Sequence, residues 1–308
     1  MTYDVAVVGS PFLDLTFEGL PHLPRVKEEV VARTLHVAPG GTGMQALASA
    51  RLGLTTALVA PIGRTGAASL VRAAIEREGV RIVDRGPEVP GPAPEMQVPT
   101  TALLTTSEGV AMATVLDGSE PSPADVATVE ARAAVVSLGR LGLAPPRAAV
   151  YAVTGALEVG HVDDATIARL SSARALVLNA AEALALTGCA DPEAAARNLA
   201  RRVTIAVVTT GAGGALAAQN EGVTRAHTPE VDVVDATGAG DLFVAAYVWA
   251  DLHGAPLADR LAWASLYAGL SVRAPTAYAG ALKLEELLAE GRSRGLAEPP
   301  ALESVSPL

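Results

Sequence analysis

VDVVDATGAGDLFVAAYVWA, residues 231–250, is the stretch that decides how this sequence is read. Three small residues, Gly238, Ala239 and Gly240, stand between two carboxylates, and an apolar run typical of a helix follows them. A helix N-terminus offers N–H groups without intrahelical partners and the positive end of the helix dipole, and glycine lets the backbone approach an anion closely. The stretch therefore predicts a turn suited to binding a phosphate group.

The carboxylate of Asp241 brings a negative charge to the same turn, where it would repel a bound phosphate. It has a use there if it takes a proton from a hydroxyl group that then attacks the phosphate, while the N–H groups stabilise the charge of the transferring group. An Asp that caps a helix after a tight turn explains the same residues without chemistry. Both interpretations stay open on these residues alone.

Composition excludes several classes of protein. The 308 residues are 50% hydrophobic, which is enough for a large core in one α/β domain or two smaller ones. A net charge of −10 argues against a nucleic acid as a partner. The single cysteine, Cys189, excludes an intrachain disulfide, and the sequence contains no CxxC or HExxH metal pattern.

The N-terminal residues MTYDVAVVG have no basic segment before their apolar run, so they do not predict a signal peptide. No run approaches the roughly 18 apolar residues that a membrane helix needs. We expect a cytoplasmic protein without a membrane partner.

Short, continuous apolar runs alternate with helical patterns along most of the chain. YDVAVVG (3–9), ARAAVVSLG (131–139) and ARALVLN (173–179) are typical of buried strands, and DPEAAARNLARR (191–202) of a helix. Such alternation predicts a doubly wound, mainly parallel sheet with helices on both faces. Segments 13–17, 29–37 and 101–116 instead alternate apolar and polar residues, which predicts a separate small β-sheet lid with one face towards water.

We therefore expect one α/β domain over residues 1–295, with lid strands from about 13–37 and 99–116. A hairpin turn is predicted at Glu108–Gly109, and the Pro-rich segment 85–99 is predicted to be a loop. Residues 296–308 are expected to form a frayed C-terminal tail.

DATGAGDLF (235–243) closely resembles the D-T-x-G-A-G-D signature of the PfkB-type carbohydrate kinases of the ribokinase-like superfamily. In that family the last Asp is the catalytic base and the Gly-Ala-Gly backbone is the anion hole. The resemblance implies the same roles for Asp241 and for Gly238, Ala239 and Gly240. It extends from Val5 to about Leu288, and the family's fold is the α/β body with a β lid that the periodicity predicts.

LNAAE (178–182) places Asn179 and Glu182 three residues apart at a predicted helix start. An amide and a carboxylate on one helix face suit hydrated Mg²⁺ on nucleotide phosphates. A plain cap with Glu in the first turn is the better explanation when the pair is taken alone. Beside the first motif the pair resembles the family's N-x-x-E motif, which implies nucleotide binding by Asn179 and a water-mediated Mg²⁺ contact by Glu182.

Two N-terminal segments resemble the family's acceptor-binding motifs. In VGSPFLDLTF (8–17), Asp14 stands where the family has an Asp that binds substrate hydroxyls, and in PGGTGMQALASARLG (39–53) the pair Gly40 and Gly41 is expected to approach the substrate. Here the chain departs from the pattern, which has an Asn a few residues after the glycine pair. Met44 and Gln45 stand there instead, and Gln45 is the candidate replacement.

VVTTGAGGAL (207–216) resembles the family's nucleotide loop, which implies that Thr209, Gly211 and Gly214 lie near ATP. Some members also bind a monovalent cation. Asp235 and Thr237 match the first half of that site, whereas RAPTAYAGA (273–281) matches the second half poorly.

The resulting hypothesis is an ATP- and Mg²⁺-dependent kinase that phosphorylates a hydroxyl group of a sugar, with a hydroxymethyl group as the expected acceptor. A homodimer formed through the lid is a further expectation. A nucleoside kinase stays open as an alternative, because Phe12 and Phe17 flank Asp14 and could stack on a base, although aromatic residues are only 3% of the chain. A second alternative is a sugar-binding regulator without activity, which the presence of Asp241 and Glu182 disfavours. An oxidoreductase is excluded by the missing glycine fingerprint.

Overall fold

The computed structural model describes residues 2–64, 66–84, 98–116 and 120–300. Most of the Pro-rich segment, at residues 85–97, and the end of the tail, at residues 301–308, lie outside these ranges, so the expectations for them are not addressed. No helix in the described part of the chain is long and apolar enough to cross a bilayer.

The continuous apolar runs form one large sheet, as their pattern predicts. In the described residues its nine strands follow the order β13 (Gly222–Ala226), β12 (Ala215–Gln219), β11 (Ala206–Thr209), β10 (Ala175–Asn179), β9 (Ala149–Val153), β8 (Glu130–Ser137), β1 (Thr2–Val8), β4 (Thr56–Val59) and β5 (Arg81–Val83). The strands from β11 to β5 are parallel, whereas β12 and β13 add an antiparallel edge. The prediction of a mainly parallel sheet is confirmed, although strand β13 was not predicted.

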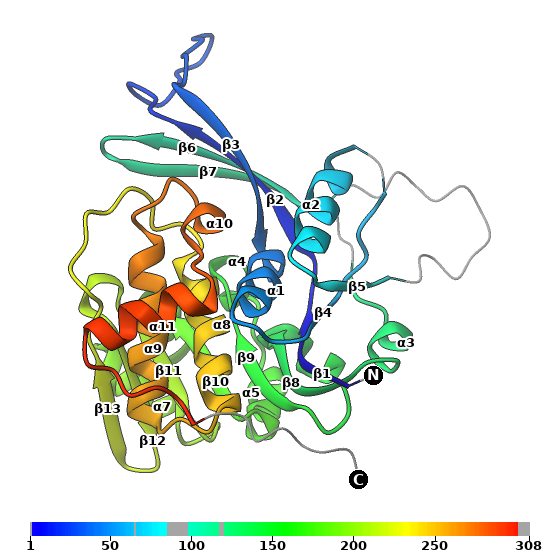
Figure 1. Ribbon diagram of the computed structural model, residues 1–308, viewed down its shortest axis with the longest axis vertical. Helices are drawn as coiled ribbons and strands as arrows, with labels where there is room; N and C mark the ends of the chain where they lie inside the picture. The colour runs from blue at the N-terminus through cyan, green and yellow to red at the C-terminus, as the bar shows by residue number, and fades with distance from the viewer. Residues whose placement is uncertain (1, 65, 85–97, 117–119, 301–308) are drawn as a thin grey trace.

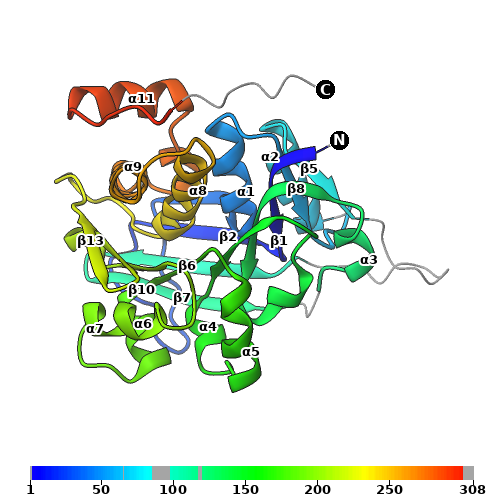
Figure 2. The same cartoon turned by 90° about the horizontal axis from the view of Figure 1, so that it is seen from below.

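Helices cover both faces of this sheet (Figure 2), which is why the buried runs of its central strands, such as residues 5–8 of β1 and 133–136 of β8, are apolar. One face is covered by α1 (Thr42–Arg51), α2 (Gly66–Arg77), α8 (Ala239–Leu252), α9 (Leu257–Ser271) and α11 (Leu284–Ser293). The other is covered by α3 (Pro123–Val126), α4 (Ala156–Val159), α5 (Asp164–Arg169), α6 (Ala180–Thr187) and α7 (Pro192–Leu199). Two separate apolar cores result, one on each side of the sheet.

Three short 3₁₀ helices, η1 (Leu138–Leu143), η2 (Leu170–Ser172) and η3 (Gly211–Gly213), and the short helix α10 (Ala277–Gly280) complete the described body. The chain after α11 is more ordered than the expected frayed tail. Leu296 packs against the core, and the indole N–H of Trp263 donates a hydrogen bond to the Ala297 carbonyl at 2.9 Å. Burial of these groups explains why the chain stays on the body at least this far.

The alternating segments form a second sheet that stands on the body as a lid, in the order β3 (Thr34–Gly41), β2 (Pro11–Glu18), β6 (Thr100–Thr106) and β7 (Gly109–Val115) (Figure 1). In register, Asp14 lies opposite Ala38 on β3 and Thr101 on β6. Because side chains alternate along a strand, Asp14 and Thr16 share the face that is turned towards the body.

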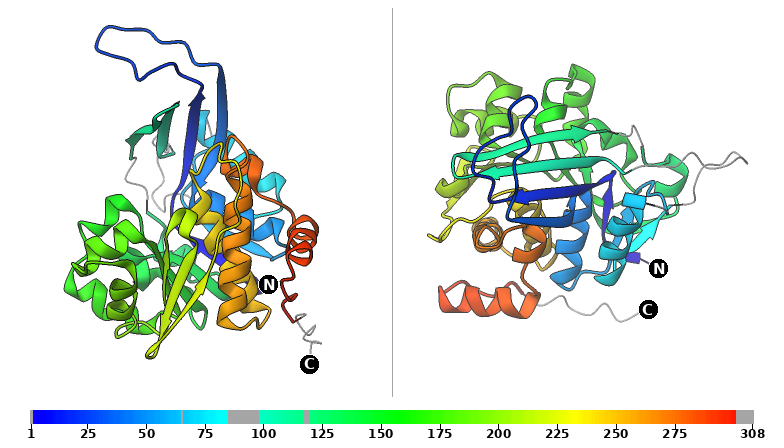
Figure 3. Two further views of the ribbon diagram at one scale, coloured as in Figure 1. Left: turned by 90° about the vertical axis from the view of Figure 1, so that its left-hand side faces the viewer. Right: turned by 90° about the horizontal axis from the view of Figure 1, so that it is seen from above.

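Two details of the predicted lid are wrong. Residues 29–33 are not a strand, because the last residue pair of β2 and β3 is Glu18 with Thr34 and nothing beyond it supplies a partner strand. Residues 19–33 instead form a long arm that extends away from the body (Figure 3). The hairpin turn lies at Ser107–Glu108, one residue earlier than predicted, since Gly109 already pairs with Thr106.

Candidate active site

The start of α8 is shaped by Gly238, which caps the helix with a positive φ of 79°. A side chain there would be strained, and its Cβ would lie 2.7 Å from the Cβ of Ala277. Ala239 and Gly240 are the first helical residues, so their N–H groups lie at the positive end of the helix dipole. The predicted turn is therefore a backbone surface that suits an anion.

Asp241 follows in the first turn of α8, and the amide of Gln45 on α1 donates a hydrogen bond to its Oδ1 at 2.9 Å. Burial raises the pKa of Asp241 to about 7, the nearby charges of Asp14 and Glu182 act in the same direction, and the bond from Gln45 opposes the rise. A carboxyl group with this pKa can accept a proton near neutral pH and release it again.

A small cavity of about 20 Å³ lies between the lid and the body, and Asp241 is on its wall. It is lined from the lid by Asp14, Thr16, Ala38, Pro39, Gly40 and Leu103, and from the body by Asp235, Thr237, Gly238, Asp241, Thr276, Ala277 and Tyr278. In this conformation the cavity has room for about one water molecule. Its described lining includes three carboxylates and no Lys, Arg or His.

Asp14 enters this cavity from β2. Burial raises the pKa of Asp14 to about 6, and the neighbouring charge of Asp235 adds to the effect; none of the described residues donates a hydrogen bond to its carboxylate. A Cβ on Gly40 would overlap that carboxylate. The glycine expected to approach a substrate is thus required by the Asp14 side chain, whereas Gly41, with a φ of 53°, lies beside the ring of Phe12.

The residues before the helix also face the small cavity. Asp235 is buried, and its Oδ1 accepts a hydrogen bond from the backbone N–H of Thr237 at 2.8 Å. The described residues contain no group of three or more His, Cys, Asp or Glu side chains placed to hold a metal ion. For Asp235 and Thr237 the geometry shows a turn that precedes Gly238.

Asn179 and Glu182 sit where β10 ends and α6 begins, and they form a reciprocal capping box with both hydrogen bonds at 2.9 Å. The plain cap is therefore present. Both residues also line a middle cavity of about 200 Å³, which Gln45, Thr154 and Asp241 line as well. Burial raises the pKa of Glu182, although its bonds to Asn179 lower it in part.

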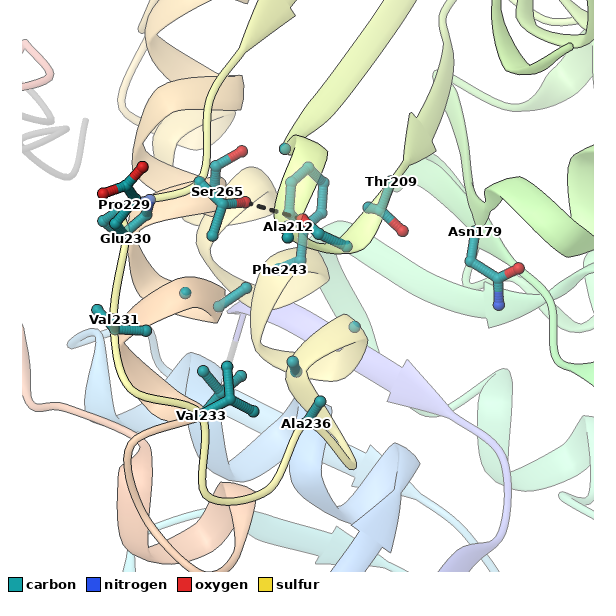
Figure 4. A pocket seen from close by; sticks show the side chains of 18 residues that line it. Asn179, Thr209, Ala212, Pro229, Glu230, Val231, Val233, Ala236, Phe243 and Ser265 are labelled. Atoms are coloured by element: carbon teal, nitrogen blue, oxygen red, sulfur yellow. Dashed lines mark hydrogen bonds between the residues drawn. The ribbon is translucent and has the colours of Figure 1, made fainter. Parts of the chain in front are cut away.

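A large cavity of about 510 Å³ opens on the other side of Asn179, between the loop after β11 and the helices α8 and α9 (Figure 4). Most of its lining is apolar, including Val231, Val233 and Phe243. Thr209, Gly211 and Gly214 all lie on its wall, as predicted from the loop sequence. Gly214 has a φ of 90°, and a Cβ there would overlap the Ala226 carbonyl.

The three cavities lie in series. The large and middle cavities share Asn179, Thr209 and Gly240, and the middle and small cavities share Gly238 and Asp241. Asn179 and Thr209 end parallel strands, and the carboxyl edge of such a sheet is where ligands bind in doubly wound folds. Asp241 and the turn 238–240 therefore stand between a polar cavity under the lid and an apolar cavity for a larger ligand.

Other lining residues were not predicted. They include Thr16, Leu103, Thr154, Ser265, Thr276 and Tyr278. Leu103, Thr154 and Ser265 lie outside every segment that resembles a family motif, and Thr16, Thr276 and Tyr278 lie within such segments without being singled out, so only the packing of distant elements identifies them. The suggestion that Phe12 and Phe17 flank a bound base is wrong for Phe17, because alternation places it on the face opposite Asp14, and Phe12 does not line the small cavity.

Residues 161–283 match the family model described as pfkB family carbohydrate kinase. A relative, the acarbose 7(IV)-phosphotransferase of Actinoplanes sp. (strain ATCC 31044 / CBS 674.73 / SE50/110), is 28% identical over an alignment of 309 positions that covers 92% of this chain and 97% of that protein.

Two solved structures show how closely the fold is shared. Arabidopsis thaliana ribokinase, complexed with ribose and ATP, is 22% identical with a TM-score of 0.73 and covers 94% of this chain and 99% of its own. The adenosine kinase of Sinorhizobium meliloti is 17% identical with a TM-score of 0.75 and covers 96% and 100%. The fold is ribokinase-like, and the relatives are kinases that act on sugars or nucleosides.

Proposed function

We propose that this chain, a ribokinase-like protein whose residues 161–283 match the pfkB family carbohydrate kinases, transfers the γ-phosphoryl group of ATP to a hydroxyl group of a sugar. The observation that carries the proposal is the series of three cavities around Asp241 and the turn 238–240, since Asp241 lines the small and middle cavities and Gly240 lines the middle and large ones. The small cavity carries groups suited to the hydroxyl groups of an acceptor, the middle cavity suits phosphate groups, and the large cavity suits a nucleotide base.

Asp241 is the general base of this mechanism. Its carboxylate lies on the wall of the small cavity, where it takes the proton of the acceptor hydroxyl group as the oxygen attacks the γ-phosphorus. The N–H groups at Gly238, Ala239 and Gly240 and the dipole of α8 stabilise the charge on the transferring phosphoryl group. The product phosphate then leaves with its negative charge near a carboxyl group that has gained a proton, which reduces their repulsion.

The acceptor is held by Asp14 beside Gly40; of the other two residues that the resemblance implies, Gln45 lines the middle cavity and reaches the acceptor only next to Asp241, and Gly41 lines none of the three cavities. Since none of the described residues donates to the carboxylate of Asp14, that group can accept hydrogen bonds from two hydroxyl groups of a sugar. Since the described lining carries acids and no cationic side chain, it suits an uncharged polyol better than a sugar that already bears a phosphate.

The nucleotide occupies the large cavity, with the base among the apolar side chains and the phosphates towards Asn179, Thr209, Gly211 and Gly214. The middle cavity suits Mg²⁺ because its oxygen donors, Asn179 and Glu182, are the kind that the ion prefers, and because Glu182 and Asp241 bring two carboxyl groups to its wall. Glu182 would hold the ion through water, and the ion would neutralise charge on the phosphates.

A panel of candidate acceptors, each assayed with ATP for release of ADP, is the experiment that tests this proposal. The chain should release ADP from ATP only when a sugar or another polyol is present, and neutral sugars should exceed sugar phosphates in kcat/KM. A nucleoside acceptor remains the second candidate, because the adenosine kinase shares the fold, and nucleosides belong in the same panel. ATP turnover that no acceptor stimulates, with sugar binding intact in calorimetry, would instead favour the inactive, sugar-binding regulator.

Activity should depend on pH through Asp241. Only the ionised carboxylate accepts a proton, so kcat/KM should rise as the pH increases through about 7, the raised pKa of Asp241. Gln45→Leu removes the hydrogen-bond donor that lowers the pKa of Asp241, so it should move the acidic limb of the pH profile to higher pH. Profiles of kcat/KM from about pH 5 to pH 9 for the two proteins check this; superimposable acidic limbs would contradict the assignment of Asp241 as base.

Glu182→Gln should raise the Mg²⁺ concentration needed for half-maximal rate by about tenfold. The amide oxygen of Gln can still accept the Asn179 N–H bond, so the helix cap is kept while the charge is lost. Mg²⁺ titrations of the initial rate measure the effect. Glu158→Gln is the matched control, because Glu158 lies near Glu182 without lining the middle cavity. Equal titrations for all three proteins would leave Glu182 as a cap only.

Four further features remain predictions: a single kinase domain over residues 1–295, a cytoplasmic location, a monovalent cation at Asp235 and Thr237, and a homodimer formed through the lid. The lid does expose apolar side chains, among them Leu35, Val37 and Val115. Sedimentation of the full chain would test the dimer.

A further inference from the structure

Arg51, in the last turn of α1, forms a partly buried link between three parts of the chain. Its Nη1 donates hydrogen bonds to the carbonyl oxygens of Tyr278 and Ala281, both at 2.7 Å, and its Nη2 donates to Oε1 of Glu78 at 2.7 Å. The guanidinium carbon lies 4.7 Å from the centre of the Tyr278 ring. One side chain thus ties the segment 276–281 to α1 and to the residue after α2.

The segment that Arg51 holds is part of the candidate active site. Thr276, Ala277 and Tyr278 line the small cavity together with Asp14 and Asp241. Ala277 also packs against the turn of the anion hole, since a Cβ on Gly238 would lie 2.7 Å from its own. A displacement of the segment would therefore alter the acceptor cavity and the start of α8 at once.

The chemistry of the guanidinium suits this task. Its fork directs two donors at two carbonyl oxygens while a third contact pairs with a carboxylate, which an ammonium group on a flexible stem cannot reproduce. Burial lowers the pKa of Arg51, but the bond and charge of Glu78 outweigh it, so the pKa is raised and the charge is kept. The C-terminal end of α1 is the negative end of the helix dipole, and it stabilises the positive charge of Arg51.

We infer that Arg51 is a positioning residue for the proposed phosphoryl transfer: it holds segment 276–281 so that the acceptor meets Asp241 in the reactive orientation. The inference rests on the proposed function. Arg51 lines none of the three cavities and acts through the segment, so its loss should affect the acceptor far more than the nucleotide, whose cavity has no lining residue from 276–281.

The test is Arg51→Lys, with Arg72→Lys as a matched control. Both guanidinium groups are on the same side of the sheet, both side chains are 13% exposed, and in both Nε is buried without a hydrogen-bond partner. Arg72 also binds a carbonyl and a carboxylate, of Ile62 and Asp84, but neither residue lines a cavity of the site. Comparable losses of thermal stability are expected, so the two variants separate positioning from general destabilisation.

We expect Arg51→Lys to raise the KM of the acceptor about tenfold and to lower kcat several-fold, with the KM of ATP within about twofold of wild type. Arg72→Lys should leave both KM values within about twofold. Glu78→Gln, which weakens the same link more gently, should raise the acceptor KM by about two- to threefold and remains informative if Arg51→Lys does not fold. An acceptor KM that is unchanged in whichever Arg51 or Glu78 variant folds, or that rises equally in Arg72→Lys, overturns the inference. A wild-type protein that phosphorylates no acceptor would instead refute the proposed function.

Discussion

Asp241→Asn should lose about 10²- to 10⁴-fold in turnover, the usual contribution of a general base, and keep its fold and its affinity for the nucleotide. The amide occupies the same volume, and its oxygen can still accept the 2.9 Å hydrogen bond from Gln45. Steady-state rates and nucleotide titration on the same preparation check both halves of the expectation. Asp232→Asn, an exposed Asp in the loop before the helix, is the control and should turn over like wild type.

Asp241→Asn should also make the folded protein more stable than wild type above about pH 7. The folded-state pKa of Asp241 is raised to about 7 from an ordinary value of 3.8, so the folded chain binds this proton more tightly than the unfolded chain does. The stability that Asp241 contributes to the folded state is therefore present below about pH 3.8 and is lost as the pH rises from 3.8 to about 7. Asn carries no charge and avoids that loss. Near-wild-type turnover, or a lower melting temperature at pH 8 than wild type, would refute the role assigned here.

The second large effect is expected at Asp14. Asp14→Ala should lower kcat/KM for the sugar by about ten- to over a hundredfold, because each hydrogen bond to a charged group contributes about 1.5–3 kcal/mol and about 1.4 kcal/mol corresponds to tenfold. The nucleotide should bind as before, since Asp14 lines only the small cavity. Steady-state kinetics in both substrates and a nucleotide titration measure the two effects.

Glu18→Ala is the matched control for Asp14, because Glu18 lies on the same strand and the same face but pairs with His36 outside the cavity. It should leave the sugar kinetics unchanged. Equal losses for sugar and nucleotide in Asp14→Ala would mean that Asp14 supports the lid structure, and the acceptor would then have to be bound by other groups of the small cavity.

The sequence predicted the features whose signals are local. The turn at 238–240 and Asp241 stand in one segment, where glycine, helix start and carboxylate appear together, and the capping box of Asn179 and Glu182 is equally short. The large sheet followed from runs of apolar residues that only a doubly covered strand tolerates.

What the sequence could not supply was the meeting of distant segments. Gln45 was chosen as an acceptor ligand, but 196 positions separate it from Asp241, and only the packing of α1 beside α8 shows that its amide bonds the carboxylate. The sequence around Arg51 does not indicate its contacts, because an Arg at the end of a helix usually lies in solvent. The alternation of apolar and polar residues over 29–33 predicts a strand, but the pattern carries no information on where the neighbouring strand β2 ends.

Helix α8 has a consequence for how this protein can vary. From Leu242 to Asp251 every residue of the helix is buried, and Asp251 is held at its far end by Tyr151, Arg174 and Arg260. Mutational tolerance should therefore be lowest along the helix that carries Asp241. The lid strands meet solvent on their outer face, so random libraries and natural drift have more freedom there, and on their inner face they supply six of the residues that line the small cavity. New acceptor preferences can accordingly evolve, or be selected, in the lid while helix α8 stays untouched.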